Sequence, residues 1–185
     1  MTIITSGGQQ GIELACKALC NEGDAVICEN PSFIGALNSF RSLGVTPYGA
    51  ELDDDGINLD QVEQLIKTVP NVKMLYTIPT FQNPTGIVMP MSRREKLLKY
   101  CNDAHIPIIE DDVFRDLWLD APPPPPIKSL DGHGNVVYIG SLSKCFAPGL
   151  RLGWLVGPEA VVQRLADVKM QMDYGVSVLT QQVAE

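Results

Sequence analysis

Histidine is nearly absent from this chain: only His105 and His133 occur among its 185 residues. A catalytic triad built on histidine, or a metal site with several histidine ligands, is therefore not expected. The five cysteines are odd in number and include no Cys-x-x-Cys pair, which argues against a disulfide framework and a zinc ribbon. Cys16 and Cys20 could share a helix face as metal ligands, but with no other ligands nearby buried packing is favoured. We predict no metal site.

Long apolar runs and an excess of basic residues are also missing. No apolar stretch approaches the roughly 20 residues that a membrane-spanning helix needs, and the first eight residues do not resemble a signal peptide. Lysine and arginine total 14 against 22 acidic residues, for a net charge of −8. This balance disfavours contact with nucleic acid or an anionic membrane by this chain alone. We expect a cytoplasmic protein.

Short apolar runs alternate with helical patterns along the chain. The runs predict strands at residues 25–28, 45–48, 73–78, 106–109, 136–139 and 152–156. The helical patterns predict helices at residues 9–20, 31–43, 59–67 and 92–104, and one that starts at Pro158; Ser92 and Glu95 would form a capping box. Strands separated by helices indicate a three-layer α/β/α domain with a mostly parallel sheet. The last two strands have no helix between them, so that pair is expected to be antiparallel.

Residues 140–153 carry the strongest chemical signal. Lys144 follows a predicted buried strand in a loop of small residues, Gly-Ser-Leu-Ser-Lys, which makes its amine a candidate Schiff-base nucleophile. The hydroxyls of Ser141 and Ser143 and the guanidinium of Arg151 could hold a phosphate beside it. The long string of matching residue types makes this signal specific.

Three further segments lie beside predicted strand ends or helix starts. Ser-Gly-Gly-Gln-Gln (6–10) opens a helix and is either an anion site made of backbone amides or an ordinary cap. Pro-Thr-Phe-Gln-Asn-Pro-Thr-Gly (79–86) follows a strand and could also be a plain turn. Glu-Asp-Asp (110–112) follows an apolar strand and could be merely solvated acids. Open α/β sheets bind ligands at the carboxyl ends of their strands, so we expect these segments to meet there.

Together these four features resemble the large domain of fold-type-I pyridoxal-phosphate enzymes, the aspartate-aminotransferase superfamily. The likeness covers essentially the whole chain. Ser-Gly-Gly-Gln-Gln (6–10), Glu-Asn-Pro-Ser-Phe (29–33) and Ala-Pro-Gly-Leu-Arg-Leu-Gly-Trp (147–154) most resemble the aminoadipate/kynurenine aminotransferases and the aminotransferase-like domains of MocR-type regulators. The resemblance implies pyridoxal 5′-phosphate as cofactor and a homodimer for the full-length protein.

The resemblance also implies residue roles. Lys144 would form the Schiff base with the cofactor and later move the substrate α-proton. Asp111 would face the pyridine nitrogen and keep it protonated, with Asp112 as the alternative. Asn83 would hydrogen-bond the 3-oxygen of the ring, and Phe33 would stack on the ring face.

The phosphate of the cofactor would be bound by backbone amides, hydroxyls and one guanidinium, from Gly8, Gln9, Ser141, Ser143 and Arg151. Two aromatic positions depart from the family pattern. Phe114 stands where the family usually has a tyrosine that donates a hydrogen bond to the 3-oxygen, so the packing is kept and the donor is lost. Phe33 also replaces a common tyrosine, and stacking survives that change.

The predicted activity is transfer of an amino group between an amino acid and a 2-oxo acid. An alternative is an effector-sensing domain of a MocR/GntR-type transcriptional regulator, and a third is a domain that binds another phosphate ligand. The chain begins and ends abruptly, so we expect residues 1–185 to be the cofactor-binding large domain, truncated at both ends. The N-terminal arm and the C-terminal small domain would then be absent.

Overall fold

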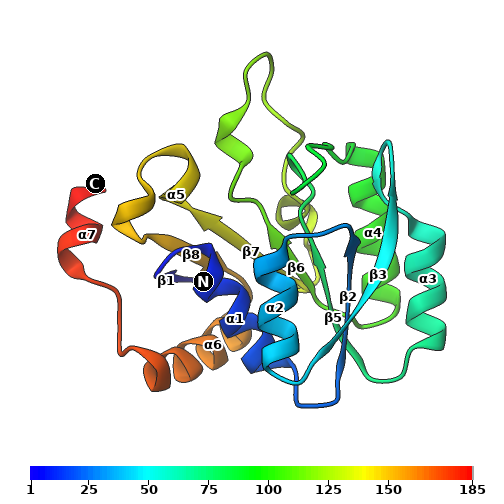
Figure 1. Cartoon of the computed structure of the whole chain (residues 1–185), viewed down its shortest axis with the longest axis horizontal. Coiled ribbons are helices and arrows are strands. Elements are labelled where there is room, and N and C mark those ends of the chain that lie inside the picture. Colours follow the sequence, from blue (N-terminus) through cyan, green and yellow to red (C-terminus); the bar gives the residue numbers. More distant parts are fainter. Residues whose placement is uncertain (185) are drawn as a thin grey trace.

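An eight-stranded sheet forms the centre of the computed structural model, which describes residues 1–184 (Figure 1). Its spatial order is β1-β8-β7-β6-β5-β2-β3-β4. The strands are β1 (Thr2–Thr5), β2 (Ala25–Asn30), β3 (Thr46–Asp53), β4 (Gly56–Ile57), β5 (Val72–Thr77), β6 (Ile108–Asp111), β7 (Val136–Ser141) and β8 (Gly153–Val156).

Five neighbouring strands, from β7 across to β3, pair in parallel. β8 is antiparallel to β7 as predicted, although the connection contains two short helical turns, at Leu142–Cys145 and Pro148–Leu150. β1 is antiparallel to β8, and the short β4 is antiparallel to β3. The predicted fold class, a mostly parallel sheet with an antiparallel strand, is confirmed.

Helices cover both faces of the sheet. α1, α2 and α6 pack on one face, and α3 and α4 pack on the other (Figure 1). The helices are α1 (Gly8–Leu19), α2 (Ile34–Ser42), α3 (Leu59–Thr68), α4 (Met91–Asp103), α5 (Leu142–Cys145), α6 (Glu159–Met172) and α7 (Val178–Val183). Short 3-10 helices are η1 (Arg115–Leu117), η2 (Ile127–Leu130) and η3 (Pro148–Leu150).

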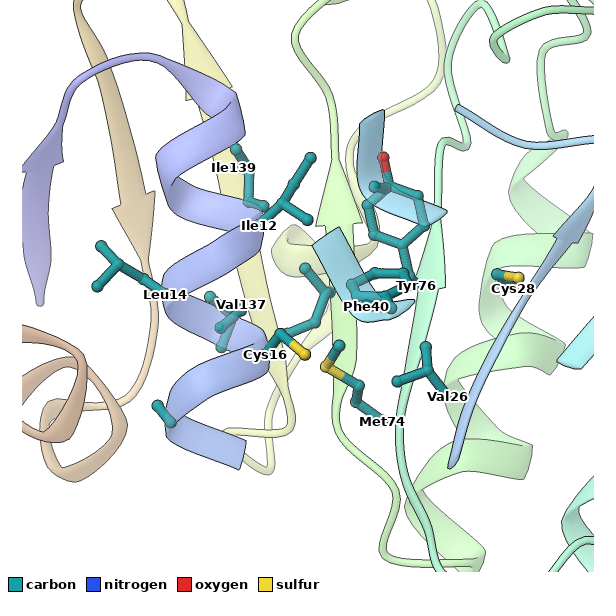
Figure 2. Packing of buried hydrophobic residues seen from close by; sticks show 14 of the residues in the cluster. Ile12, Leu14, Cys16, Val26, Cys28, Phe40, Met74, Tyr76, Val137 and Ile139 are labelled. Carbon is teal, nitrogen blue, oxygen red and sulfur yellow. The ribbon is translucent and has the colours of Figure 1, made fainter. Parts of the chain in front are cut away.

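The period-two alternation of the strands creates two separate apolar cores. On β5, Met74 and Tyr76 lie in the core beneath α1 and α2, whereas Leu75 between them lies in the core beneath α3 and α4. Figure 2 shows the first core, in which Cys16 packs among buried side chains. Cys20 is only partly buried and packs against the same core. The packing interpretation of Cys16 therefore holds.

The start of α4 differs from the prediction. The helix begins at Met91 with Pro90 at the cap position, and no side chain caps it. The Pro90 carbonyl accepts hydrogen bonds from the amides of Arg93 and Arg94. Ser92 already lies inside the first turn, so the predicted capping box with Glu95 is wrong.

The bounds of other helices and strands also differ from the prediction. α2 begins at Ile34 rather than Pro31, and the carbonyl of Pro31 instead accepts a hydrogen bond from the Gln82 side chain. β3 continues to Asp53, five residues beyond the predicted strand. The predicted terminal helix is two helices, α6 and α7, and Glu185 lies outside the described residues. Within the described chain, no helix is long and apolar enough to cross a membrane.

Gly153 lets the two antiparallel strands reach the site. It pairs with Thr5 of β1 on one side and Ser141 of β7 on the other. A Cβ atom added to Gly153 would lie 2.8 Å from the carbonyl carbon of Gly7 and 2.9 Å from the carbonyl oxygen of Gly140. Both obstacles are backbone atoms, so neither can rotate away.

We predict that Gly153→Ala lowers the free energy of unfolding by about 2 kcal/mol, because the added methyl group overpacks rigid backbone. Urea denaturation measures the loss. Gly149→Ala is the matched control, since its Cβ would meet no atom of residues 1–184 within 4 Å. Equal stability of the two variants would contradict the close approach.

Candidate cofactor site

A pocket of about 180 Å³ opens beside the carboxyl ends of β6 and β7. All ten predicted site residues line it: Gly8, Gln9, Phe33, Asn83, Asp111, Phe114, Ser141, Ser143, Lys144 and Arg151. Three apolar side chains that sequence reasoning missed, Ile12, Ile78 and Val113, complete the lining. In the sequence these three residues look like ordinary core residues, and only the assembled sheet shows that they line the pocket.

The N-terminus of α1 contributes free backbone amides to the pocket. Gly7 precedes this 12-residue helix with φ +84°, and no side chain caps the helix. Any side chain at Gly7 would collide with the guanidinium of Arg151. Gly8 and Gln9 therefore present their amides, while the Gln9 side chain donates to the Gly35 carbonyl and the Ser39 hydroxyl on α2.

Arg151 joins the two segments that form this end of the pocket. Its Nη2 donates to the carbonyl of Ser6 at 2.8 Å, and its Nη1 donates to Ser143 Oγ at 3.2 Å. Ser141 caps α5, because its Oγ accepts a hydrogen bond from the amide of Ser143 at 3.1 Å. A cation, two hydroxyls and a helix N-terminus together make a site for a phosphate group.

Lys144 stands in the short helix α5 at the exposed side of the pocket. Its Nζ lies 5.8 Å from the centroid of the Phe114 ring, so the aromatic face attracts the ammonium group. The amine thus lies over a ring that also lines the pocket. Solvent access and this position suit a nucleophile that must reach a bound ligand.

Asp111 supplies the buried charge of the pocket. Its Oδ2 accepts a hydrogen bond from the Tyr76 hydroxyl at 2.6 Å. Its Oδ1 is buried and has no hydrogen-bond partner anywhere in residues 1–184. Burial raises the pKa of Asp111 to about 6. A buried carboxylate oxygen without a donor is costly unless a ligand donor completes it, and the protonated nitrogen of a pyridine ring fits that need.

Asp112 is directed elsewhere. It does not line the pocket, and Arg115 Nε lies 2.9 Å from its Oδ2 as an ion pair. Asp112 follows the last residue of β6, and its carboxylate faces Arg115 rather than the pocket. The geometry therefore favours Asp111 over the alternative for a ring contact.

Glu110 anchors the other face of β6. Its two carboxylate oxygens accept from the amides of Ile127 and Lys128 at 2.7 and 2.8 Å. Arg94, fully buried, has its Nη1 3.8 Å from Glu110 Oε1 and donates from Nη2 to the carbonyl of Pro79 at 2.8 Å. This charge network fixes the segment that leads to Asn83. An arginine in the predicted helix at residues 92–104 gives no sequence sign of such burial, so the prediction missed it.

The whole chain, residues 1–185, matches the family model for aminotransferase class I and II. The chain belongs to the aminotransferase class I and II family. Members of this family use pyridoxal phosphate, so the family and the cofactor predicted from the sequence are confirmed.

Solved aminotransferases share the fold closely. The kynurenine aminotransferase of Pyrococcus horikoshii, crystallised with PMP, is 36% identical with a TM-score of 0.95; the match covers 99% of this chain and 46% of that one. LysN, the alpha-aminoadipate aminotransferase of Thermus thermophilus, is 33% identical with a TM-score of 0.95, over 99% of this chain and 48% of LysN. The predicted resemblance to this branch is therefore confirmed.

Curated relatives include both regulators and enzymes. YdfD of Bacillus subtilis, an uncharacterized HTH-type transcriptional regulator, is 46% identical over 182 residues, covering 98% of this chain and 38% of YdfD. The aromatic-amino-acid aminotransferase 1 of Thermococcus litoralis is 36% identical over 184 residues, covering 97% of this chain and 44% of that enzyme. The chain thus spans about two fifths of the length of these relatives.

The Glu110 carboxyl should make stability depend on pH. Burial raises its pKa from 4.5 to about 7, so the folded protein holds this proton at pH values where the unfolded chain releases it. Its contribution to the free energy of unfolding therefore falls as pH rises from 4.5 to 7. We predict that the stability of the unchanged protein relative to Glu110→Gln drops by up to about 3 kcal/mol over this window.

Urea denaturation at several pH values measures this difference. The exposed Glu95→Gln variant on α4 is the control, and its stability relative to the unchanged protein should not vary in the same way. A difference for Glu110→Gln that is constant with pH would contradict the raised pKa.

Proposed function

We propose that this chain is the pyridoxal-phosphate-binding large domain of a longer protein and that the cofactor occupies the pocket beside β6 and β7. The observation that carries the proposal is the buried, unpartnered Asp111 Oδ1 in a pocket that also contains a phosphate cradle and Lys144. Each feature alone has ordinary explanations. A buried acceptor, an anion site and an accessible amine in one pocket match three functional groups of this cofactor: its ring nitrogen, its phosphate and its aldehyde.

The phosphate would be bound by the amides of Gly8 and Gln9 and by Ser141, Ser143 and Arg151. Ser141, Ser143 and Arg151 are already held in place by their mutual hydrogen bonds, so little ordering of them is needed on binding. Asn83 would donate to the 3-oxygen of the ring, and Phe33 would cover one ring face. Phe114 offers packing without a hydroxyl, so the 3-oxygen would lack a donor from that position.

When bound, the cofactor supplies an aldehyde that captures an amino group and a pyridinium ring that withdraws electrons from the substrate Cα. Asp111 would hold the proton on the ring nitrogen through Oδ1. Lys144 Nζ would hold the aldehyde end of the cofactor and would be the base that takes up and returns the substrate α-proton.

The proposed reaction transfers an amino group between an amino acid and a 2-oxo acid. The family and the named activities of the relatives support it. The segments that would choose the substrate are the N-terminal arm and the C-terminal small domain of the full-length protein. We propose that this protein is a cytoplasmic homodimer.

A second candidate function has specific support. YdfD and YisV of Bacillus subtilis, both named HTH-type transcriptional regulators, are 46% and 43% identical to this chain, above the 36% of the aminotransferase of Thermococcus litoralis. The same pocket would then sense an effector for a regulator whose DNA contact comes from other sequence. The net charge of −8 is consistent with a regulator in which this chain does not contact the DNA.

We predict that the purified chain mixed with pyridoxal phosphate gains a visible absorption band, and that borohydride fixes the cofactor on Lys144, as peptide mapping would show. Lys144→Ala should lose both the band and the trapped product, because no amine remains to bond to the aldehyde. Lys67→Ala, which removes an exposed lysine of α3, is the matched control. Equal trapping in the Lys144→Ala protein would contradict the assignment.

The full-length natural protein distinguishes the two candidate functions. An aminotransferase should release a 2-oxo acid from an amino acid over many turnovers. A regulator should bind its own upstream DNA and change that affinity when an amino acid is added, with no sustained turnover. Sustained turnover without DNA binding would reject the sensor.

A further inference from the structure

Tyr76 is a fully buried residue of β5 whose side chain contacts Asp111 of the candidate cofactor site. Its hydroxyl donates to Asp111 Oδ2 at 2.6 Å. β5 and β6 are parallel neighbours, with Thr77 opposite Glu110. The side chains of Tyr76 and Asp111 therefore meet from adjacent strands. Tyr76 does not line the pocket, and it therefore acts on a ligand only through Asp111.

The Tyr76 ring is itself held in place. The Phe40 ring of α2 packs edge-on against it, with centroids 5.6 Å apart and planes at 74°. Figure 2 shows the two rings together, with the Tyr76 hydroxyl pointing away from Met74. Burial and the nearby Asp111 raise the pKa of Tyr76 well above 10, so the hydroxyl keeps its proton and stays a donor.

This donor occupies one oxygen of the Asp111 carboxyl and leaves the other free. Oδ1 is without a partner among the described residues, so the Tyr76 bond to Oδ2 is the side-chain contact that sets the rotation of the carboxyl group. A carboxylate held at one oxygen presents a fixed acceptor at the other. We propose that Tyr76 is a positioning residue that holds Asp111 through Oδ2 so that Oδ1 receives the N–H of the cofactor ring. This role rests on the proposed function of the pocket.

Tyr76 also affects the pKa of the Asp111 carboxyl. Burial, and to a smaller degree the neighbouring Asp112, raise the pKa of Asp111, whereas hydrogen bonding by the Tyr76 hydroxyl and by the Val113 backbone lowers it. Burial, and to a smaller degree the charge of Asp111, raise the pKa of Glu29. The carboxylate oxygens of Glu29 accept hydrogen bonds from Thr77, Ile78 and Gln82, so they already have donors. Lys144 and Arg151 are the two cations in the same pocket lining. Removing the Tyr76 hydroxyl should therefore favour the protonated, uncharged form of Asp111.

Cofactor binding by Tyr76→Phe provides the test. We expect about tenfold weaker binding of pyridoxal phosphate, because the carboxylate loses its fixed orientation and its donor. An analogue with CH in place of the ring nitrogen should bind both proteins within about twofold of each other, since it cannot use Asp111. Tyr48→Phe on β3, which removes a hydroxyl of the same sheet outside the pocket, is the control and should bind both ligands normally.

Two further measurements separate positioning from general damage. In an Asp111→Asn background, Tyr76→Phe should add no further loss, because its effect passes through that carboxylate. In the cofactor-free protein, ¹³C NMR titration of the Asp111 carboxyl should show a higher midpoint in Tyr76→Phe than in the unchanged protein. The second readout needs no ligand.

The outcomes are distinct. Failure of the unchanged protein to bind pyridoxal phosphate would overturn the proposed function. Normal binding by both the unchanged and Tyr76→Phe proteins, with equal Asp111 midpoints, would overturn only the role of Tyr76. Equal losses for pyridoxal phosphate and the CH analogue would also overturn it, because they would indicate a distorted pocket.

Discussion

The candidate site depends on one carboxylate oxygen that the fold buries without a partner, Asp111 Oδ1. Desolvating such an acceptor costs stability, and the fold accepts that cost at the end of a central strand. The neighbouring side chains offset part of this desolvation cost. Tyr76 donates to the second oxygen, and Asp112 beside it is paired with Arg115. An unmet buried acceptor on a residue that lines a pocket is what a binding site for a donor requires.

The phosphate cradle depends on pairing between the first and the last strand of the sheet in sequence order, β1 and β8. β1 lies beside β8, and Gly153 brings the loop before α1 against the segment that ends β7. Arg151 then bridges Ser6 and Ser143, which lie 137 residues apart in the sequence. The helix N-terminus and the hydroxyl-bearing loop are thus parts of one site because the sheet closes there with antiparallel strands.

Much of this could be predicted from the sequence, for identifiable reasons. Lys144, Asp111 and Arg151 stand in motifs just after apolar strands, and strand ends of a parallel sheet share an edge. Tyr76 and Arg94 could not be predicted, because a tyrosine in a strand and an arginine in a helix look ordinary until neighbouring strands are placed. The Ser92 cap failed because Pro90 starts the helix earlier. β1 was missed because four residues leave little periodicity.

The central claim is that Asp111 accepts the proton-bearing nitrogen of a bound pyridoxal phosphate. ¹⁵N NMR of the protein loaded with cofactor labelled at the ring nitrogen tests it directly, since the chemical shift distinguishes a protonated from a neutral pyridine nitrogen. The account predicts a protonated nitrogen at pH 7.5 in the unchanged protein and a neutral one in Asp111→Asn. A neutral nitrogen in the unchanged protein would contradict the account.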